Sequence, residues 1–224
     1  ATFTGNANSF TMERNTTPMI IYDYTYWSSP VADQKLVTFS PLTLSDKYYS
    51  FNGTNWFIEN RDNLMTPGRG YIIRAPQGWN GNITHGGTSQ NETHANGSFD
   101  PGVFKGVFKG KANAGDITVP LLGNVGSSNL LGNPYPSAIS TQDFIAANPG
   151  KIDGTFYFWT HKTRVSTTPN ANGTYSYNNQ DYAVYNKTGG TSTTPLGDKP
   201  NGKINSGQGF FVRTTGTGNV VFKH

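Results

Sequence analysis

The feature that most constrains the fold is a pattern that occurs twice, in which a Gly-x-Gly turn leads directly into an apolar strand. Gly68-Arg69-Gly70 precedes residues 71–74, and Gly207-Gln208-Gly209 precedes residues 210–213, an offset of 139. Two similar β-units each present an apolar face, and packing them together buries both faces. The pattern therefore predicts two related β-units. The alternative is that both segments use the residues common in strands and turns, without any duplication.

Weaker echoes give the extent of each unit. Phe3 matches Phe108 at an offset of 105, and Tyr49 matches Phe156 at 107. The offset between matching residues then rises to 139 at the second Gly-x-Gly turn, which indicates an insertion in the second unit. Nearer the end of each unit the offset falls again, which indicates a different insertion in the first unit. We expect a first β-repeat over residues 1–106, with an inserted loop at about 75–102. A second repeat would cover residues 107–224, with an inserted segment at about 160–203.

The rest of the chain is typical of an all-β protein. Short aromatic and β-branched runs alternate with clusters of Gly, Asn, Pro and Ser. Asn52-Gly53 predicts a hairpin turn with a positive φ angle, and Ser140 opens a segment that resembles a helix capping box. The fold class expected is all-β: two related β-units packed as β-sandwich or jelly-roll-like layers, with one short helix near 140–148. Strands are expected at residues 19–27, 47–51, 56–58, 71–74, 156–159, 182–185 and 210–213.

Composition excludes several classes of protein. Charged residues make up 13% of the chain, which is too few for a coiled coil or helical bundle, and aromatic residues also make up 13%, which argues against disorder. The absence of cysteine excludes disulfides, thiolate zinc sites and a cysteine nucleophile. No apolar run approaches the roughly 18 residues of a membrane span, so no transmembrane segment is expected. No signal peptide is visible, which suggests a mature or excised fragment.

The net charge of +4 does not indicate nucleic-acid binding. The densest basic stretch is Lys105, Lys109 and Lys111, whose spacing in a strand places them on one solvated face. We therefore expect no nucleic-acid partner.

Five segments resemble a module of large secreted cell-surface proteins of Bacteroidetes, especially flavobacteria: residues 22–31, 65–76, 131–139, 154–161 and 206–212. The resemblance extends from about Met12 to Phe222. In that family the module precedes a type IX secretion C-terminal sorting domain, and the parent proteins resemble adhesins. The resemblance implies an extracellular, cell-surface location, neighbouring surface domains in the parent chain, and glycans or a host or environmental surface as partner. It supplies no catalytic motif.

Aromatic residues in the insertions are the candidate ligand contacts. Trp79 lies in a polar, glycine-rich loop, and Tyr175 and Tyr177 alternate in the second insertion. Sugar rings present flat C–H faces on which aromatic side chains stack, so a ligand, if one is bound, is expected to be carbohydrate. Packing of Trp79 under its own loop, and an added strand lined by the two tyrosines, are the alternatives. The other tryptophans begin or end apolar strands and are expected in the core: Trp27, Trp56 and Trp159.

The expected function is a non-catalytic extracellular surface module of an adhesin-like secreted protein, with carbohydrate as its ligand. A structural spacer or display module is one alternative, and a fragment of a polysaccharide-degrading enzyme is another. No catalytic residues are expected, although glycosidase carboxylates can come from distant strands. Asp23, Asp153 and Asp181 lie beside aromatic strands, where turn-capping or hydrogen-bonding roles are expected. The Gly-x-Gly pairs lead into strands rather than helices, unlike a dinucleotide-binding loop.

No cofactor is expected, and calcium is the one that the sequence leaves open. Asp100 and Asp198 are the loop carboxylates that could contribute oxygen ligands. His85 and His94 lie in the first insertion without a metal-ligand spacing, so solvated loop histidines are expected there. The metal ligands, if there are any, stay unknown.

Overall fold

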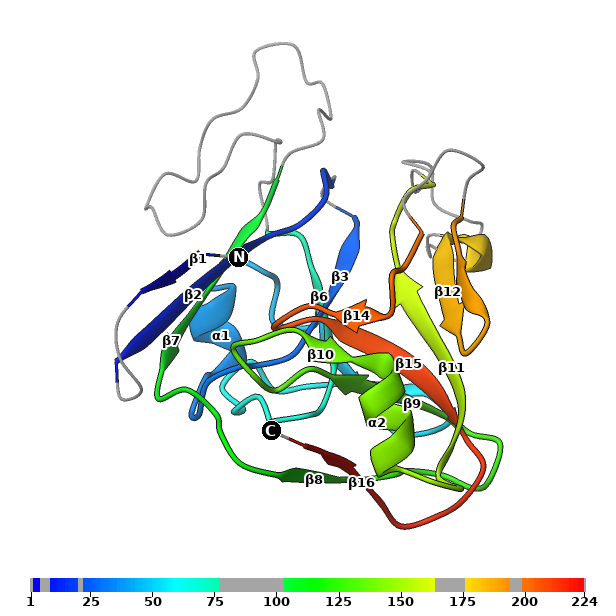
Figure 1. Cartoon of the computed structure of the whole chain (residues 1–224). Helices are drawn as coiled ribbons and strands as arrows, with labels where there is room; N and C mark the ends of the chain where they lie inside the picture. Colours follow the sequence, from blue (N-terminus) through cyan, green and yellow to red (C-terminus); the bar gives the residue numbers. More distant parts are fainter. Residues whose placement is uncertain are drawn as a thin grey trace.

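The computed structural model describes residues 2–4, 9–19, 22–76, 103–163, 176–193 and 199–223. It is mostly β, with 43% strand and 8% helix arranged as several antiparallel sheets (Figure 1). Helix content is far below the third that is usual in globular proteins, so the expected all-β class is confirmed. No helix among the described residues is long and apolar enough to cross a membrane.

Four antiparallel strands form what we call the N-terminal sheet. Its order is β3 (Tyr24–Trp27), β6 (Tyr71–Arg74), β4 (Tyr48–Phe51) and β5 (Trp56–Ile58). The β4–β5 turn has the expected glycine, with Gly53 at φ 96°. The Asn52 side-chain oxygen fixes this turn, because it accepts hydrogen bonds from the amides of Thr54 and Asn55 at 3.0 and 2.8 Å.

Five antiparallel strands form the C-terminal sheet. Its order is β13 (Gly189–Thr191), β12 (Tyr182–Asn186), β11 (Ile152–Trp159), β15 (Gly209–Thr214) and β9 (Ser128–Gly132). Strands β9, β15, β11 and β12 follow the same order as β3, β6, β4 and β5. The repeat boundary between residues 106 and 107 stays a prediction, and strand β7 (Lys105–Gly110) spans it.

The strand register corrects one of the sequence echoes. Tyr49 lies opposite Ile72 in the N-terminal sheet, and Tyr157 lies opposite Phe211 in the C-terminal sheet. Ile72 and Phe211 correspond at the offset of 139, so Tyr49 corresponds to Tyr157, at an offset of 108 rather than 107. The difference matters because a shift of one residue moves a strand's side chains to the opposite face.

Shorter elements cover the two main sheets. One three-stranded sheet and two strand pairs complete the β-structure: β1 (Thr2–Thr4), β2 (Phe10–Asn15) and β7; β8 (Ile117–Pro120) with β16 (Asn219–Phe222); and β10 (Ile139–Ser140) with β14 (Lys203–Ile204). The helices are α1 (Leu36–Phe39), α2 (Thr141–Ala147) and the 3₁₀ turn η1 (Asn179–Asp181).

The expected helix near residues 140–148 is confirmed as α2. The Ser140 side chain caps it by accepting a hydrogen bond from the amide of Asp143 at 3.3 Å. The expectation of a single helix is wrong, because α1 is also present. That helix has only four residues, and Lys35 at its N-cap makes no side-chain cap, so the sequence carries no helix signal there.

Each main sheet packs one face on its own core. Trp27 and Phe108 belong to the core of the N-terminal half, and Phe156 and Phe210 belong to that of the C-terminal half. The opposite faces of both sheets contribute to a third cluster, whose buried members come from both halves: Tyr26, Ile72, Leu130 and Phe211. The two sheets therefore share one apolar face.

The sheets join at a seam formed by the two Gly-x-Gly turns. The Gly132 amide donates to the Gly68 carbonyl, and the Ser28 amide donates to the Gly207 carbonyl, both at 3.0 Å. Gly68 and Gly207 have φ angles of 81° and 67°, which confirms the prediction that they are turn glycines. At Gly70 a Cβ atom would lie 2.6 Å from the Leu131 carbonyl oxygen. The second glycine of that turn is therefore required for close approach of the two sheets.

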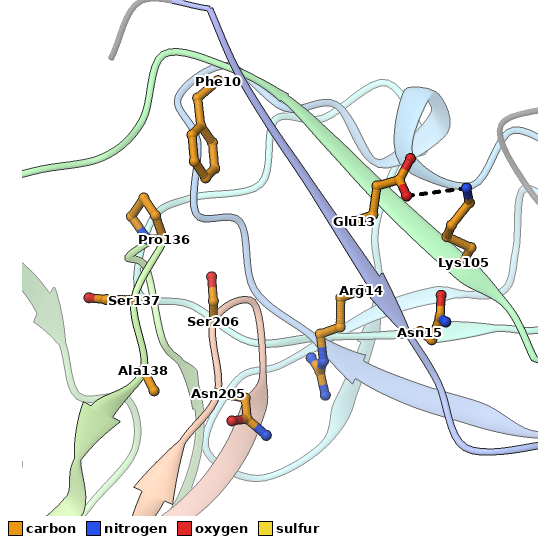
Figure 2. A pocket seen from close by; sticks show the side chains of 10 residues that line it. All are labelled: Phe10, Glu13, Arg14, Asn15, Lys105, Pro136, Ser137, Ala138, Asn205 and Ser206. Atoms are coloured by element: carbon orange, nitrogen blue, oxygen red, sulfur yellow. Dashed lines mark hydrogen bonds and ion pairs between the residues drawn. The ribbon is translucent and has the colours of Figure 1, made fainter. Parts of the chain in front are cut away.

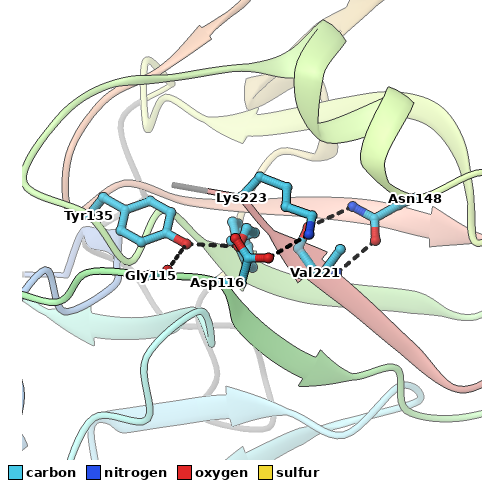
Figure 3. A network of polar contacts seen from close by, with 7 residues as sticks. Gly115, Asp116, Tyr135, Asn148, Val221 and Lys223 are labelled. Atoms are coloured by element: carbon cyan, nitrogen blue, oxygen red, sulfur yellow. Dashed lines mark hydrogen bonds and ion pairs between the residues drawn. The ribbon is translucent and has the colours of Figure 1, made fainter.

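A polar network ties α2 to the strand pair β8–β16 (Figure 3). The Asn148 side chain donates to the carbonyls of Phe144 and Val221 at 2.8 and 2.9 Å, and it accepts from the Val221 amide at 2.7 Å. The Tyr135 hydroxyl donates to the carbonyls of Gly115 and Phe222 at 2.7 and 2.8 Å. These bonds fix the layer that covers the C-terminal core.

Candidate functional site

The face shared by the two sheets carries an aromatic cleft. Along β3, Tyr24 and Tyr26 alternate with the core-facing Trp27, and along β11, Tyr157 and Trp159 alternate with core-facing phenylalanines. Successive side chains in a strand point to opposite faces. These strands therefore present aromatic residues to both faces.

The cleft has two adjacent lobes, with volumes of about 330 and 300 Å³. Trp56 and Tyr182 line both lobes and so lie where they meet. The first lobe is also lined by Tyr24, Tyr26, Tyr49, Ile72, Trp159, Tyr177 and Asn179. The second is also lined by Phe51, Ser128, Tyr157 and Phe211.

The rings that line the cleft hold one another in place. Tyr26 stacks on Trp159, with centroids 6.1 Å apart and planes inclined by 13°. Trp56 meets Phe51 and Phe211 edge-on, at 5.1 and 5.7 Å. Edge-on and offset contacts of this kind stabilise aromatic clusters, so the wall of the cleft is formed before any ligand arrives.

Three of the tyrosine hydroxyls of the cleft are held in the protonated form by burial. Burial raises the pKa of Tyr24, Tyr26 and Tyr182 above the ordinary tyrosine value. The hydroxyls of Tyr26 and Tyr182 are hydrogen-bonded to each other. No charged side chain lines either lobe within the described part of the chain, so the cleft is neutral over the ordinary pH range.

One polar group at the cleft lacks a partner. The indole Nε1–H of Trp159 is buried and makes no hydrogen bond with other described residues. A buried donor without an acceptor costs about 1–3 kcal/mol.

Of the three predicted ligand residues, Tyr177 lies at this cleft. Its side chain is 38% exposed, and its ring centroid lies 5.7 Å from that of Tyr24 and 6.3 Å from that of Trp159. Its hydroxyl donates to the Tyr22 carbonyl at 2.8 Å. It occupies an irregular segment just before η1 rather than an added strand. Trp79 and Tyr175 lie outside the described residues, so the loop contacts predicted there stay predictions.

The expected core position of Trp56 is wrong. Trp56 is 42% exposed, because β5 is the edge strand of its sheet and nothing pairs beyond it among the described residues. Trp159 is half-buried and faces the cleft. Trp27, which is 1% exposed, is in the core as expected. Aromatic residues on both faces of a strand were the signal that a second, partly covered face exists.

The three acidic residues beside the aromatic strands, Asp23, Asp153 and Asp181, all make hydrogen bonds. Asp153 accepts from the Thr155 amide at 2.8 Å. The Asp181 carboxylate accepts from the amide and the hydroxyl of Thr163. Asp23 is buried, and its carbonyl accepts from the Ala75 amide.

The described histidine, His161, stands in a left-handed conformation with φ 38°. Its Nε2 lies 2.7 Å from the Thr17 hydroxyl, and burial lowers its pKa. The described residues contain no group of three or more His, Cys, Asp or Glu side chains placed to hold a metal ion. His85, His94, Asp100 and Asp198 lie outside the described residues.

The fold and the cleft define a β-rich module whose two halves share one aromatic surface. A family model for a domain of unknown function, DUF8693, matches residues 2–224, so the chain belongs to that family. No curated protein and no solved structure matches the chain.

Proposed function

We propose that this chain is a non-catalytic, extracellular surface module of an adhesin-like secreted protein and that it binds a neutral glycan in the aromatic cleft. The observation that carries the proposal is the lining of the first lobe, where seven of the nine residues are Tyr or Trp. Aromatic faces stack on the C–H faces of sugar rings. The tyrosine hydroxyls and the Asn179 amide supply hydrogen bonds to the sugar hydroxyls.

The two lobes indicate the size and charge of the ligand. Each lobe lies on its own side of Trp56 and Tyr182, so a glycan of at least two linked sugars uses both. A carboxylate or sulfate placed in the cleft would lose its hydration without meeting a cation among the described lining residues, which is costly. A neutral oligosaccharide fits this environment.

Binding without catalysis is the better match to the lining. Glycoside hydrolysis normally uses two carboxyl groups on either side of the scissile bond, whereas the groups described in the cleft are rings, hydroxyls and an amide. The surface location and the adhesin-like parent rest on the five segments that resemble secreted proteins of Bacteroidetes. A spacer module and a fragment of a polysaccharide-degrading enzyme are the competing functions.

The test compares two neighbouring residues of β5. Trp56 faces the cleft, whereas Phe57 is exposed, at 57%, and lines neither lobe. A glycan array first identifies a neutral ligand, and calorimetry then measures its affinity. Trp56→Ala should weaken binding at least tenfold, about 1.4 kcal/mol, while Phe57→Ala should leave it unchanged within twofold.

Three outcomes would overturn the proposal. Equal binding by Trp56→Ala and the wild type would remove the cleft as the site. Absence of binding to any neutral glycan would favour the spacer function. Release of reducing ends from a polysaccharide, abolished by one Asp or Glu substitution, would favour the enzyme. Trp79→Ala in the same assay tests the predicted loop contact.

A further inference from the structure

A second and larger cavity lies between the two halves of the chain, and none of its lining residues belongs to the aromatic cleft. Its volume is about 750 Å³. Strand β2 and Lys105 form one wall, and residues 136–138 and 205–206 form the other (Figure 2). The size is within the range of small-molecule sites.

Arg14 is the fixed cation of this cavity. It follows Met12 by two residues and so shares the core-facing side of β2. Its guanidinium lies 4.9 Å from the centroid of the Trp27 ring, and its Nη1 donates to the Gly207 carbonyl at 2.7 Å. These two contacts hold the planar group in one orientation. Burial lowers the pKa of Arg14 to about 10, as expected for a cation that has lost much of its hydration.

The charges in the wall do not balance. Glu13 is engaged by Lys105, with Oε2 and Nζ 3.2 Å apart. Arg14 forms no ion pair with any acidic residue that the structure describes. The wall therefore holds one net positive charge, on a group that presents several parallel donors. A guanidinium group of this kind binds a carboxylate through two parallel, bidentate hydrogen bonds.

The remaining lining suits a sugar ring. The side chains of Asn15 and Asn205 are exposed and make no hydrogen bond with other described residues, so they are free to bind hydroxyls. Phe10 and Pro136 supply apolar surface on one side of the cavity, away from Arg14 and Asn15 (Figure 2).

We infer that this cavity binds an acidic sugar of the uronic-acid class, with its carboxylate on Arg14 and its hydroxyls on the neighbouring amide side chains. The site is separate from the neutral-glycan cleft and differs from it in charge. Its failure or success therefore does not depend on the proposed function.

The first experiment compares glucuronate with glucose, and galacturonate with galactose, by chemical-shift titration of the whole chain. The acids should bind and their neutral counterparts should bind at least tenfold more weakly. Trp56→Ala should retain uronate binding, because Trp56 does not line this cavity. Loss of uronate binding in that variant would place the acid in the aromatic cleft and overturn the inference.

The second experiment changes the charge of the wall without touching Arg14. The Asn205 side chain is exposed and lies on the same side of the cavity as Arg14 (Figure 2), and the hydrogen bonds described for Asn205 use its backbone, with Gln208 as partner. Asn205→Asp should weaken glucuronate binding at least tenfold, whereas the neutral Asn205→Gln should have a much smaller effect. Arg14→Lys, which keeps the charge but removes the bidentate hydrogen bonds, should also weaken it.

Other results would contradict the inference. Equal binding by the Asp and Gln variants of Asn205 would show that the carboxylate does not lie in this cavity. Acetate or phosphate binding as tightly as glucuronate would show that the cavity recognises charge alone and no sugar. Absence of uronate binding at millimolar concentration would also overturn it. Circular dichroism and thermal unfolding of each variant separate lost binding from lost folding.

Discussion

The amide of Gly132 donates a hydrogen bond to the carbonyl of Gly68 across the seam, and both residues lie where a strand of one sheet meets a turn of the other. The bond from Ser28 to Gly207 is its counterpart on the opposite side. The glycine turn of each sheet is thus hydrogen-bonded to the end of a strand in the other sheet. The relative position of the two sheets, and with it the shape of the aromatic cleft, depends on these contacts.

Gly70→Ala should destabilise the protein by about 3 kcal/mol. The new Cβ would lie 2.6 Å from the Leu131 carbonyl oxygen and 2.7 Å from the Leu130 Cγ, so the two sheets must move apart. Gly150→Ala is the control, because nothing lies within 4 Å of its Cβ and only its φ of 70° opposes the change, at about 1 kcal/mol. Urea unfolding measures both. Equal effects would show that the seam tolerates the added atom.

Stability should fall as the pH rises above 10. Burial raises the pKa of Tyr48 and Tyr135 to about 12 and raises the pKa of Tyr26 well above its ordinary value, whereas an unfolded tyrosine ionises near 10. Below pH 10 both states are protonated, so these groups contribute no pH dependence. Above it the unfolded state loses protons first and is favoured. Urea midpoints between pH 7 and 11, with tyrosinate absorbance, test this, and a flat profile would contradict it.

Asn148→Ala should cost about 3 kcal/mol, because it leaves the carbonyl and amide of Val221 without their buried partner. Lys223→Met, in the same network, should cost less than about 1 kcal/mol. Its ion pair with Asp116 is largely exposed, with side chains 59% and 50% accessible. Salt should weaken the contribution of Lys223 and leave that of Asn148 unchanged. Denaturant unfolding at two ionic strengths measures the difference.

The four tryptophans give a residue-specific test of glycan binding. A neutral oligosaccharide should shift the indole N–H resonances of Trp56 and Trp159, which line the cleft. It should leave the resonance of Trp27 unchanged, because Trp27 is buried in the N-terminal core. Single Trp→Phe variants assign the signals. A shift at Trp79 would support the loop contact predicted from the sequence. A shift confined to Trp27 would contradict the cleft as the binding site.

Much of the fold could be predicted because its local signals are strong. Strand β6 has the bounds expected, Tyr71–Arg74, since a positive-φ glycine turn precedes a short apolar run. Helix α2 was predicted from the Ser140 cap. Helix α1 lacks a cap and is a single turn. Its position depends on packing of Leu36 and Phe39 in the core, which is a tertiary effect.

The cleft could not be predicted because it depends on strand order. Trp56 begins a run of three apolar residues, which is typical of a buried strand. It is exposed because β5 lies at the edge of its sheet, and pairing order is not a local property. Tyr177 was predicted from its loop, but its neighbours Tyr24 and Trp159 come from two different sheets.

The position of Trp56 and Tyr182 at the junction of both lobes has a consequence for the origin of the site. The register makes them equivalent, since Trp56 lies opposite Phe51, Tyr182 lies opposite Trp159, and those partners correspond. Reciprocal contacts of this kind are what two identical copies make about a twofold axis. A single ancestral half, pairing with a second copy of itself, would have placed two copies of one residue at the junction between two equivalent lobes. Duplication and fusion would then have allowed one copy to be tryptophan and the other tyrosine, so that the junction offers an indole on one side and a phenol on the other and gives a bound chain a direction.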